Sequence, residues 1–132
     1  MTELDDLIHL TGYGIKVIHD SILESGSGLQ GLKPGLSVEA LVGRIHSNLF
    51  YQTFRSIEAV AALYAEVIAK GHVFNDGNKR TAVVSMLTFL DLNGYGLVVN
   101  ENQLADKIVE LSDGRTNYRQ FALWLKPKIF EN

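Results

Sequence analysis

Apolar and polar residues follow the period of an α-helix along most of the chain. Apolar side chains recur three and four positions apart, which is the spacing of one buried face of a helix. The helical segments are residues 4–24, 36–49, 56–71, 77–92, 100–111 and a last one from about residue 117 onward. The pattern predicts an all-α fold, a compact helical bundle that forms a single domain over residues 1–132.

Two helix starts are marked by hydroxyl side chains. Ser37 and Ser56 each precede a helical segment, where a serine oxygen accepts a hydrogen bond from an unpaired amide of the first turn. Gly12 and Gly14 are positions at which the first helix can divide into two pieces. The segment 77–92 is the most continuously apolar, so we expect it to be the central and most buried helix.

Three segments depart from the helical pattern. Residues 25–35 are rich in glycine and contain a proline, which predicts a loop. Residues 95–99 follow an Asn-Gly turn and predict a short strand or an extended arm. The third segment has a β-like composition and predicts a loop or a short extended hairpin; it consists of Phe50, Tyr51, Gln52, Thr53, Phe54 and Arg55.

Composition excludes several classes of function. The hydrophobic fraction of 46% and the charged fraction of 20% are typical of a globular protein. The formal net charge of −3 excludes a strongly basic surface, so we expect no direct contact with nucleic acid. The absence of cysteine excludes disulfides, thiolate catalysis and cysteine metal ligands. Early acidic residues and short apolar runs are unlike a signal peptide or a membrane span, so we expect a cytoplasmic protein without membrane contact.

Polar chemistry concentrates in GHVFNDGNKRT, residues 71–81, between two helical segments. A helix that begins near Gly77 leaves the amides of its first turn without partners, and such amides bind anions together with the helix dipole. Lys79 and Arg80 add positive charge at the same place, as a phosphate group requires. We therefore expect Gly77, Asn78, Lys79 and Arg80 to bind the phosphates of a nucleotide.

Two further side chains of this stretch are candidates for chemistry. Asp76 is a hard oxygen ligand beside the expected phosphate site and suits Mg²⁺ that is shared with a nucleotide. His72 can accept a proton near neutral pH, and Phe74 is expected to anchor the loop in the core. The set indicates phosphoryl or nucleotidyl transfer onto a hydroxyl. Individually, Asp76 or Asn75 can be a helix cap, Arg80 a surface cation and His72 a structural residue.

The other histidines are scattered along the chain. His9, His19 and His46 have no metal-ligand spacing, so we expect them to be structural.

The stretch from residue 72 to residue 80 matches without a gap the signature H-x-F-x-[DE]-[GA]-N-[GK]-R of the Fic/Doc superfamily. The resemblance extends to the His19-Asp20 pair, the glycine-rich loop, Gly43-Arg44 and the Asn-Gly-Tyr turn that begins at Asn93. It implies the helical Fic fold over most of the chain, with His72 as the catalytic base, a metal at Asp76 and ATP as the nucleotide.

The position before the final arginine of the signature separates two branches of the superfamily. Fic enzymes proper carry glycine there and transfer AMP, whereas Lys79 resembles the Doc branch. That resemblance implies that ATP presents its γ-phosphate and that the chain is a Mg²⁺- and ATP-dependent protein kinase. It also implies a toxin that phosphorylates a hydroxyl of a translation factor, elongation factor Tu, and so arrests translation. Gly77 stands where the best-known Doc signature has alanine, and glycine occurs in both branches.

The resemblance also implies partners. No glutamate lies in the inhibitory pattern [ST]-x-x-x-E-[GN], so restraint is expected from a separate Phd-like antitoxin. The family docks its target chain on a flap before the helix that precedes the signature, which here implies residues 50–55. Two alternatives stay open: an AMP transferase of the Fic kind, and a non-enzymatic module that binds its antitoxin and modulates operator binding.

Overall fold

Helices make up most of the fold, as the sequence predicts. The computed structural model describes residues 6–24, 26 and 28–132, and in this part of the chain six α-helices and one two-stranded sheet are present. The elements are α1 (Gly12–Glu24), α2 (Val38–Tyr51), α3 (Ile57–Gly71), α4 (Asn78–Leu92), β1 (Tyr95–Leu97), α5 (Glu101–Asp113), α6 (Tyr118–Leu125), the 3₁₀ helix η2 (Lys126–Lys128) and β2 (Ile129–Glu131). The predicted all-α bundle is confirmed, and no helix in the described ranges is both long enough and apolar enough to cross a membrane.

The centre of the bundle is α3, not the helix of residues 77–92 that the sequence favours. Helix α3 packs against α2, α4, α5 and α6, and nine of its residues are buried. Helix α4 buries only six residues, because Val84 and Leu87 on its outer face remain partly exposed. Some apolar residues of α4 therefore pack in the core, and others lie on an open groove at the surface.

The helix starts agree with the predicted caps. The Ser37 and Ser56 hydroxyls accept hydrogen bonds from the Ala40 and Ala59 amides, both at 3.3 Å. Asn100 and Asn117 cap α5 and α6 in the same way, each at 3.0 Å. These caps fix where four of the helices begin.

The first helix begins later than the sequence pattern predicts. Residues 4 and 5 lie outside the described residues, and α1 starts at Gly12, so the two glycines fall in its first turn rather than dividing it. Thr11 caps this start, since its hydroxyl accepts from the Gly14 amide at 3.0 Å. The preceding segment runs beside the end of α4, where the Asn93 side chain exchanges two hydrogen bonds with the backbone of Ile8.

The sheet pairs two segments that are far apart in sequence. Strand β1 confirms the strand expected at residues 95–99, and it lies antiparallel to β2, with Gly96 opposite Phe130. The hairpin considered for residues 50–55 does not form: Phe50 and Tyr51 are the last turn of α2, which extends beyond its expected end, and the next four residues are a loop.

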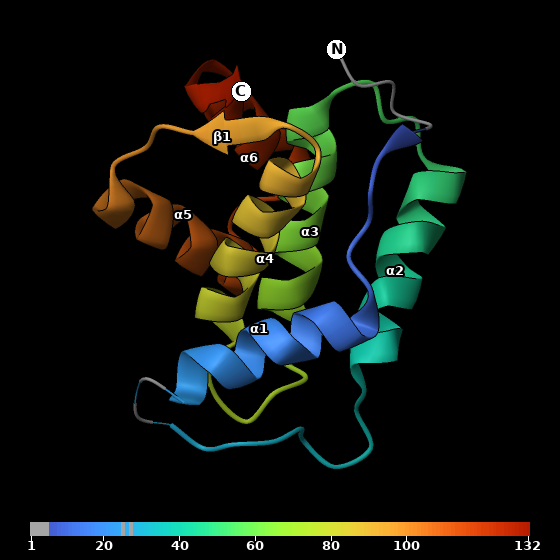
Figure 1. Cartoon of the computed structure of the whole chain (residues 1–132), viewed down its shortest axis with the longest axis vertical. Coiled ribbons are helices and arrows are strands. Elements are labelled where there is room, and N and C mark those ends of the chain that lie inside the picture. The colour runs from blue at the N-terminus through green and yellow to red at the C-terminus, as the bar shows by residue number, and fades with distance from the viewer. Residues whose placement is uncertain (1–5, 25, 27) are drawn as a thin grey trace.

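Figure 1 shows the end of the molecule at which the candidate residues lie. The loop that joins α3 to α4 is at the lower end, where α1 crosses the bundle and the chain continues into the segment before α2. The connection from α2 to α3, which contains residues 52–55, is at the upper end. The two connections are therefore separated by the length of α3.

Candidate active site

Two residues with left-handed backbone conformation define the loop between α3 and α4. Helix α3 ends where His72 adopts φ 49° and ψ 40°, and His72 is the one non-glycine residue with positive φ in the described part of the chain. Gly77, with φ 82°, is the N-cap residue directly before α4. A left-handed conformation is unfavourable for a residue with a Cβ atom, so His72 stores strain at the start of this loop.

Three buried or half-buried contacts hold the loop in shape. The side chain of Asn78 accepts from the Phe74 amide at 3.1 Å and donates to the Phe74 carbonyl at 3.0 Å. Phe74 is buried, as expected, and the His19 ring stacks on it with centroids 3.7 Å apart and planes 7° apart. His19 Nε2 donates to the Asp76 carbonyl at 2.7 Å, so this histidine has the structural role that the sequence predicts.

The other ring nitrogen of His19 faces a charged partner. Nδ1 of His19 lies 3.1 Å from Asp20 Oδ1, and the Lys16 ammonium donates to Asp20 Oδ2 at 2.7 Å. These hydrogen bonds, from Lys16 first and from His19 second, lower the pKa of the Asp20 carboxyl. Asp20 therefore stays ionised and orients the ring that supports the loop.

The segment after α1 forms the second wall of the site. It runs antiparallel to the loop through one isolated bridge, between Leu32 and Phe74. The hydrogen bonds run from Lys33 N to Val73 O (2.8 Å), from Asn75 N to Gly31 O (3.0 Å) and from Leu29 N to Asp76 Oδ2 (2.8 Å). The residues of the signature are thus fixed from both sides.

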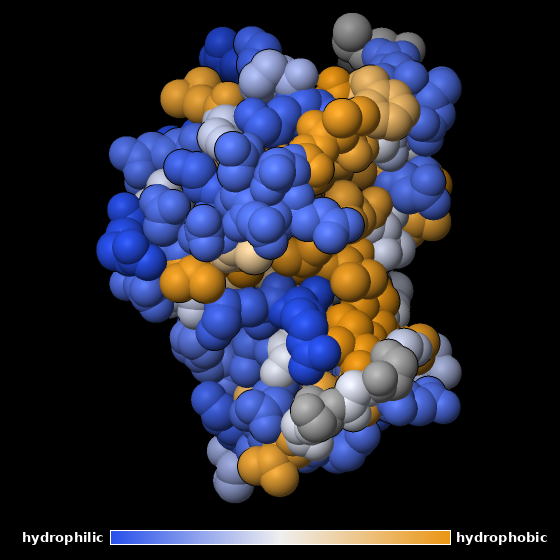
Figure 2. Space-filling model, turned by 90° about the vertical axis from the view of Figure 1, so that its left-hand side faces the viewer, coloured by the Kyte–Doolittle hydropathy of each residue, from blue (hydrophilic) through white to orange (hydrophobic). Residues whose placement is uncertain are grey.

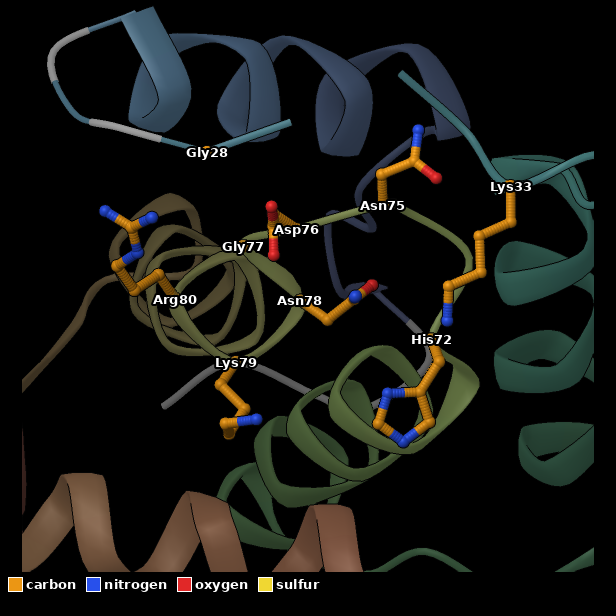
Figure 3. Close-up of a pocket in the computed structure, with 9 residues that line it drawn as sticks. All are labelled: Gly28, Lys33, His72, Asn75, Asp76, Gly77, Asn78, Lys79 and Arg80. Carbon is orange, nitrogen blue, oxygen red and sulfur yellow. The ribbon is translucent and has the colours of Figure 1, made fainter. Parts of the chain in front are cut away.

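A cavity of about 580 Å³ opens between these walls. Figure 3 shows the side chains around it, with Lys33 and His72 on one side and Arg80 on the other. The cavity brings together all six residues predicted for catalysis, nucleotide binding and metal binding. It is lined by Gly28, Lys33, His72, Asn75, Asp76, Gly77, Asn78, Lys79 and Arg80. Sequence analysis did not nominate Lys33 or Gly28, and the glycine-rich composition of residues 25–35 is the signal that points to their loop.

The cavity favours a bound anion. The first intrahelical hydrogen bond of α4 runs from Thr81 N to Gly77 O at 2.9 Å, so the amides of residues 78–80 have no partner within the helix. Gly77 has no side chain to cap them. Lys33, Lys79 and Arg80 supply three positive charges against the one carboxylate of Asp76. Neither ring nitrogen of His72 has a hydrogen-bond partner among the described residues, so either can accept a proton from a bound hydroxyl.

Asp76 suits a metal ion that is shared with a ligand. Asp76 Oδ2 accepts from the Leu29 amide, and Oδ1 has no hydrogen-bond partner among the residues that the structure describes. No group of three or more histidine, cysteine or carboxylate residues with metal-site geometry is found in the ranges that the structure describes. A single carboxylate fits Mg²⁺, which keeps water and takes phosphate oxygens rather than requiring a cage of protein ligands.

The segment predicted to dock a target is not brought to this cavity. Residues 50–55 precede α3, whereas His72 follows it, and the 15 residues of α3 correspond to about 22 Å of helix. Phe50 and Tyr51 are 80% and 75% exposed, and Gln52 accepts a hydrogen bond from Arg119. Docking of a target at this segment therefore stays a prediction, and a target held there would have to span the length of α3.

A second, apolar cavity of about 580 Å³ adjoins the first. The two cavities share Lys79 and Arg80. Within the described ranges, Glu101 is the one acidic residue that lines the apolar cavity. Figure 2 shows a band of apolar side chains on the face where this groove lies, between α4 and α5. Its apolar lining consists of Ile22, Val83, Val84, Leu87, Leu97, Val99, Leu104, Ala105, Ile108 and Val109.

The chain is similar in sequence to known proteins. Residues 10–90 match the Fic/DOC family, and this range contains both walls of the cavity. The chain is also 33% identical over 114 residues to a protein of Escherichia phage P1 that is named "Protein kinase doc". That similarity covers 86% of this chain and 90% of the phage protein.

Proposed function

The chain belongs to the Fic/DOC family, and on this premise we propose that it is a protein kinase of the Doc kind and the toxin of a toxin–antitoxin system. The observation that carries the proposal is the cavity itself. The His72 imidazole, which has no hydrogen-bond partner among the described residues, shares this cavity with three cations. It also shares it with the first amides of α4, which have no partner within the helix. A base beside an anion site is what phosphoryl transfer from ATP to a protein hydroxyl requires.

The residues divide the reaction between them. The amides of residues 78–80, with Lys79 and Arg80, bind the phosphates of ATP at the start of α4. A ring nitrogen of His72 accepts the proton of the target hydroxyl while its oxygen forms a bond to the γ-phosphorus. The bond from that phosphorus to the β–γ bridging oxygen breaks, and ADP leaves with the electron pair. Asp76 would hold Mg²⁺ together with the phosphates, and the ion would supply positive charge that offsets the negative charge of the nucleotide.

Lys79 is the residue on which the choice of transferred group depends. Its cationic side chain lines the cavity where Fic enzymes proper have glycine, so we expect the γ-phosphate rather than the α-phosphate to face the hydroxyl. ATP labelled on the γ-phosphate should label a target protein, and ATP labelled on the α-phosphate should not. Lys79→Gly should lower phosphorylation sharply, because it removes a charge that stabilises the transition state.

The same experiment decides between the alternatives. Label from the α-phosphate in the target would replace the kinase with an AMP transferase. No label from either nucleotide, with an antitoxin still bound, would favour the non-enzymatic binding module. A mass increase equal to one phosphate would agree with the kinase.

The proposed target is elongation factor Tu, modified on a threonine hydroxyl, which places the activity in the cytoplasm. The test is direct: purified elongation factor Tu should gain γ-label, and mass spectrometry should locate it on a threonine. Labelling of a different protein in a lysate, with none on elongation factor Tu, would reject this target while leaving the kinase activity in place.

The proposed antitoxin is a Phd-like protein, and the apolar groove between α4 and α5 suits its docking segment. Val84, Leu87 and Val109 are each more than a third exposed in this groove, which favours the apolar face of a helix. An acidic residue at the end of such a helix would meet Lys79 and Arg80. A segment bound here would restrain the enzyme by neutralising the charges that bind phosphate.

A further inference from the structure

Lys33 is a cation that reaches the cavity from the wall opposite α4. Its side chain is half-buried and lines the same cavity as His72. It has no ion pair or side-chain hydrogen bond with any residue in the described ranges. An ammonium group without a partner in a partly buried place is unfavourable, so its position calls for a negatively charged ligand.

The backbone fixes Lys33 next to the proposed base. The Lys33 amide donates to the carbonyl of Val73 at 2.8 Å, and Val73 follows His72 directly in the chain. Figure 3 shows the side chain of Lys33 extending toward His72, whereas Lys79 and Arg80 project from the first turn of α4. Lys33 is therefore the cation on the side of the cavity at which the target hydroxyl would enter.

The charges in the cavity also favour a ligand between the walls. Lys33, Lys79 and Arg80 repel one another, and among the described residues that line the cavity Asp76 is the one carboxylate. Asp76 accepts a hydrogen bond from the Leu29 amide, and it forms no ion pair with Lys33. An anion that spans the cavity would relieve the repulsion from both sides.

We propose that Lys33 binds the terminal phosphoryl group of ATP and stabilises it during transfer. This inference rests on the proposed kinase function and assigns a role within it. As the hydroxyl oxygen attacks and ADP leaves, the transferred group carries negative charge on its three outer oxygens. Lys33 donates hydrogen bonds to these oxygens from the side of His72, while α4 holds the phosphates that stay with ADP.

The test compares two nucleotides that differ in the terminal phosphate. Calorimetry would measure binding of a non-hydrolysable ATP analogue and of ADP to the full chain with Mg²⁺ present. Lys33→Gln should weaken the analogue about tenfold or more, the effect of losing one charged hydrogen bond, and should change ADP binding less than about twofold. Lys33→Arg, which keeps the charge, should recover most of the affinity for the analogue.

A matched control is available outside the site. Lys126 is exposed and lines neither of the two cavities, so Lys126→Gln removes the same charge without touching the cavity and should leave both affinities unchanged. Thermal melting of each variant would show that the fold is intact. The transfer rate from γ-labelled ATP should fall with Lys33→Gln and stay unchanged with Lys126→Gln.

The outcomes separate this inference from the function on which it rests. If the unaltered chain transfers γ-label but Lys33→Gln weakens ADP and the analogue equally, or weakens neither, the assignment of Lys33 is wrong and the kinase stands. If the unaltered chain binds no ATP or transfers α-label, the proposed kinase fails and the role of Lys33 fails with it. If Lys33→Gln loses affinity for the analogue and not for ADP, the result supports both the role of Lys33 and the proposed kinase function.

Discussion

Replacing His72 with glycine should abolish activity and yet leave the protein more stable than replacing it with alanine does. His72 has φ 49° at the end of α3, a conformation that costs a residue with a Cβ atom roughly 1–2 kcal/mol. Glycine adopts it without that strain. Because neither ring nitrogen of His72 has a hydrogen-bond partner among the described residues, removing the imidazole breaks no such bond there.

The net gain is smaller than the strain. Glycine has more conformational freedom in the unfolded chain, which offsets roughly 0.4–1 kcal/mol of the gain over alanine. Both variants lose the apolar contacts of the half-buried ring, so this loss does not change the difference between them. We therefore expect His72→Gly to exceed His72→Ala by about 1 kcal/mol in the free energy of unfolding. For a chain of 132 residues, that difference corresponds to about 3 °C in the melting temperature.

Melting curves and urea titrations of both variants would measure this difference, and growth arrest would measure activity. Asp106 gives the matched control, since it is exposed in the interior of α5. There, glycine should be less stable than alanine by about 1 kcal/mol, the opposite sign. If His72→Gly melts below His72→Ala, the strain argument is wrong; if either variant still arrests growth, His72 is not the catalytic base.

Three other predictions follow from single sites. Asp76→Asn keeps an acceptor for the Leu29 amide but removes the charge, so nucleotide binding should weaken more with Mg²⁺ than without it; equal losses would indicate a cap. Thr53→Pro should slow target modification and leave ATP binding unchanged, and an unaltered rate would exclude docking there. Burial first and His46 second lower the pKa of His9. The unfolded chain thus binds this proton more readily, and stability should decrease as the pH falls below the ordinary value of 6.5; His9→Phe should flatten this decrease in pH-dependent melting curves.

Local interactions explain which parts of the fold the sequence predicts. The caps at Ser37 and Ser56 join atoms three residues apart, so a short window of sequence contains both partners. The start of α1 depends on distant partners instead. Asn93 binds the backbone of Ile8 across 85 residues, and the Tyr64 hydroxyl accepts from the Leu10 amide across 54. These bonds satisfy the extended backbone where helical periodicity alone predicts helix.

The same distinction applies to the site. The signature is contiguous, so its residues reach the cavity together once α3 and α4 form, and the sequence identifies them. Lys33 reaches it through pairing with Val73, 40 positions further along the chain, and no local pattern reveals that pairing. The partner of β1 is also distant, since Tyr95 pairs with Glu131, 36 positions further along the chain. The sequence also does not predict the exposed face of α4, because apolar residues that line a groove follow the same pattern as apolar residues in a core.

The side chains that hold the loop between α3 and α4 in shape are different from the side chains that face the cavity. Phe74, His19 and the side chain of Asn78 use their contacts on the loop itself, so a change in any of them alters the shape of the cavity and the stability of the fold together. His72, Lys33 and Lys79 face the cavity, and no side-chain hydrogen bond or ion pair joins them to other residues in the described part of the chain. These three side chains are therefore available to the ligand that we propose, while the buried residues around His72 hold its left-handed backbone conformation in place.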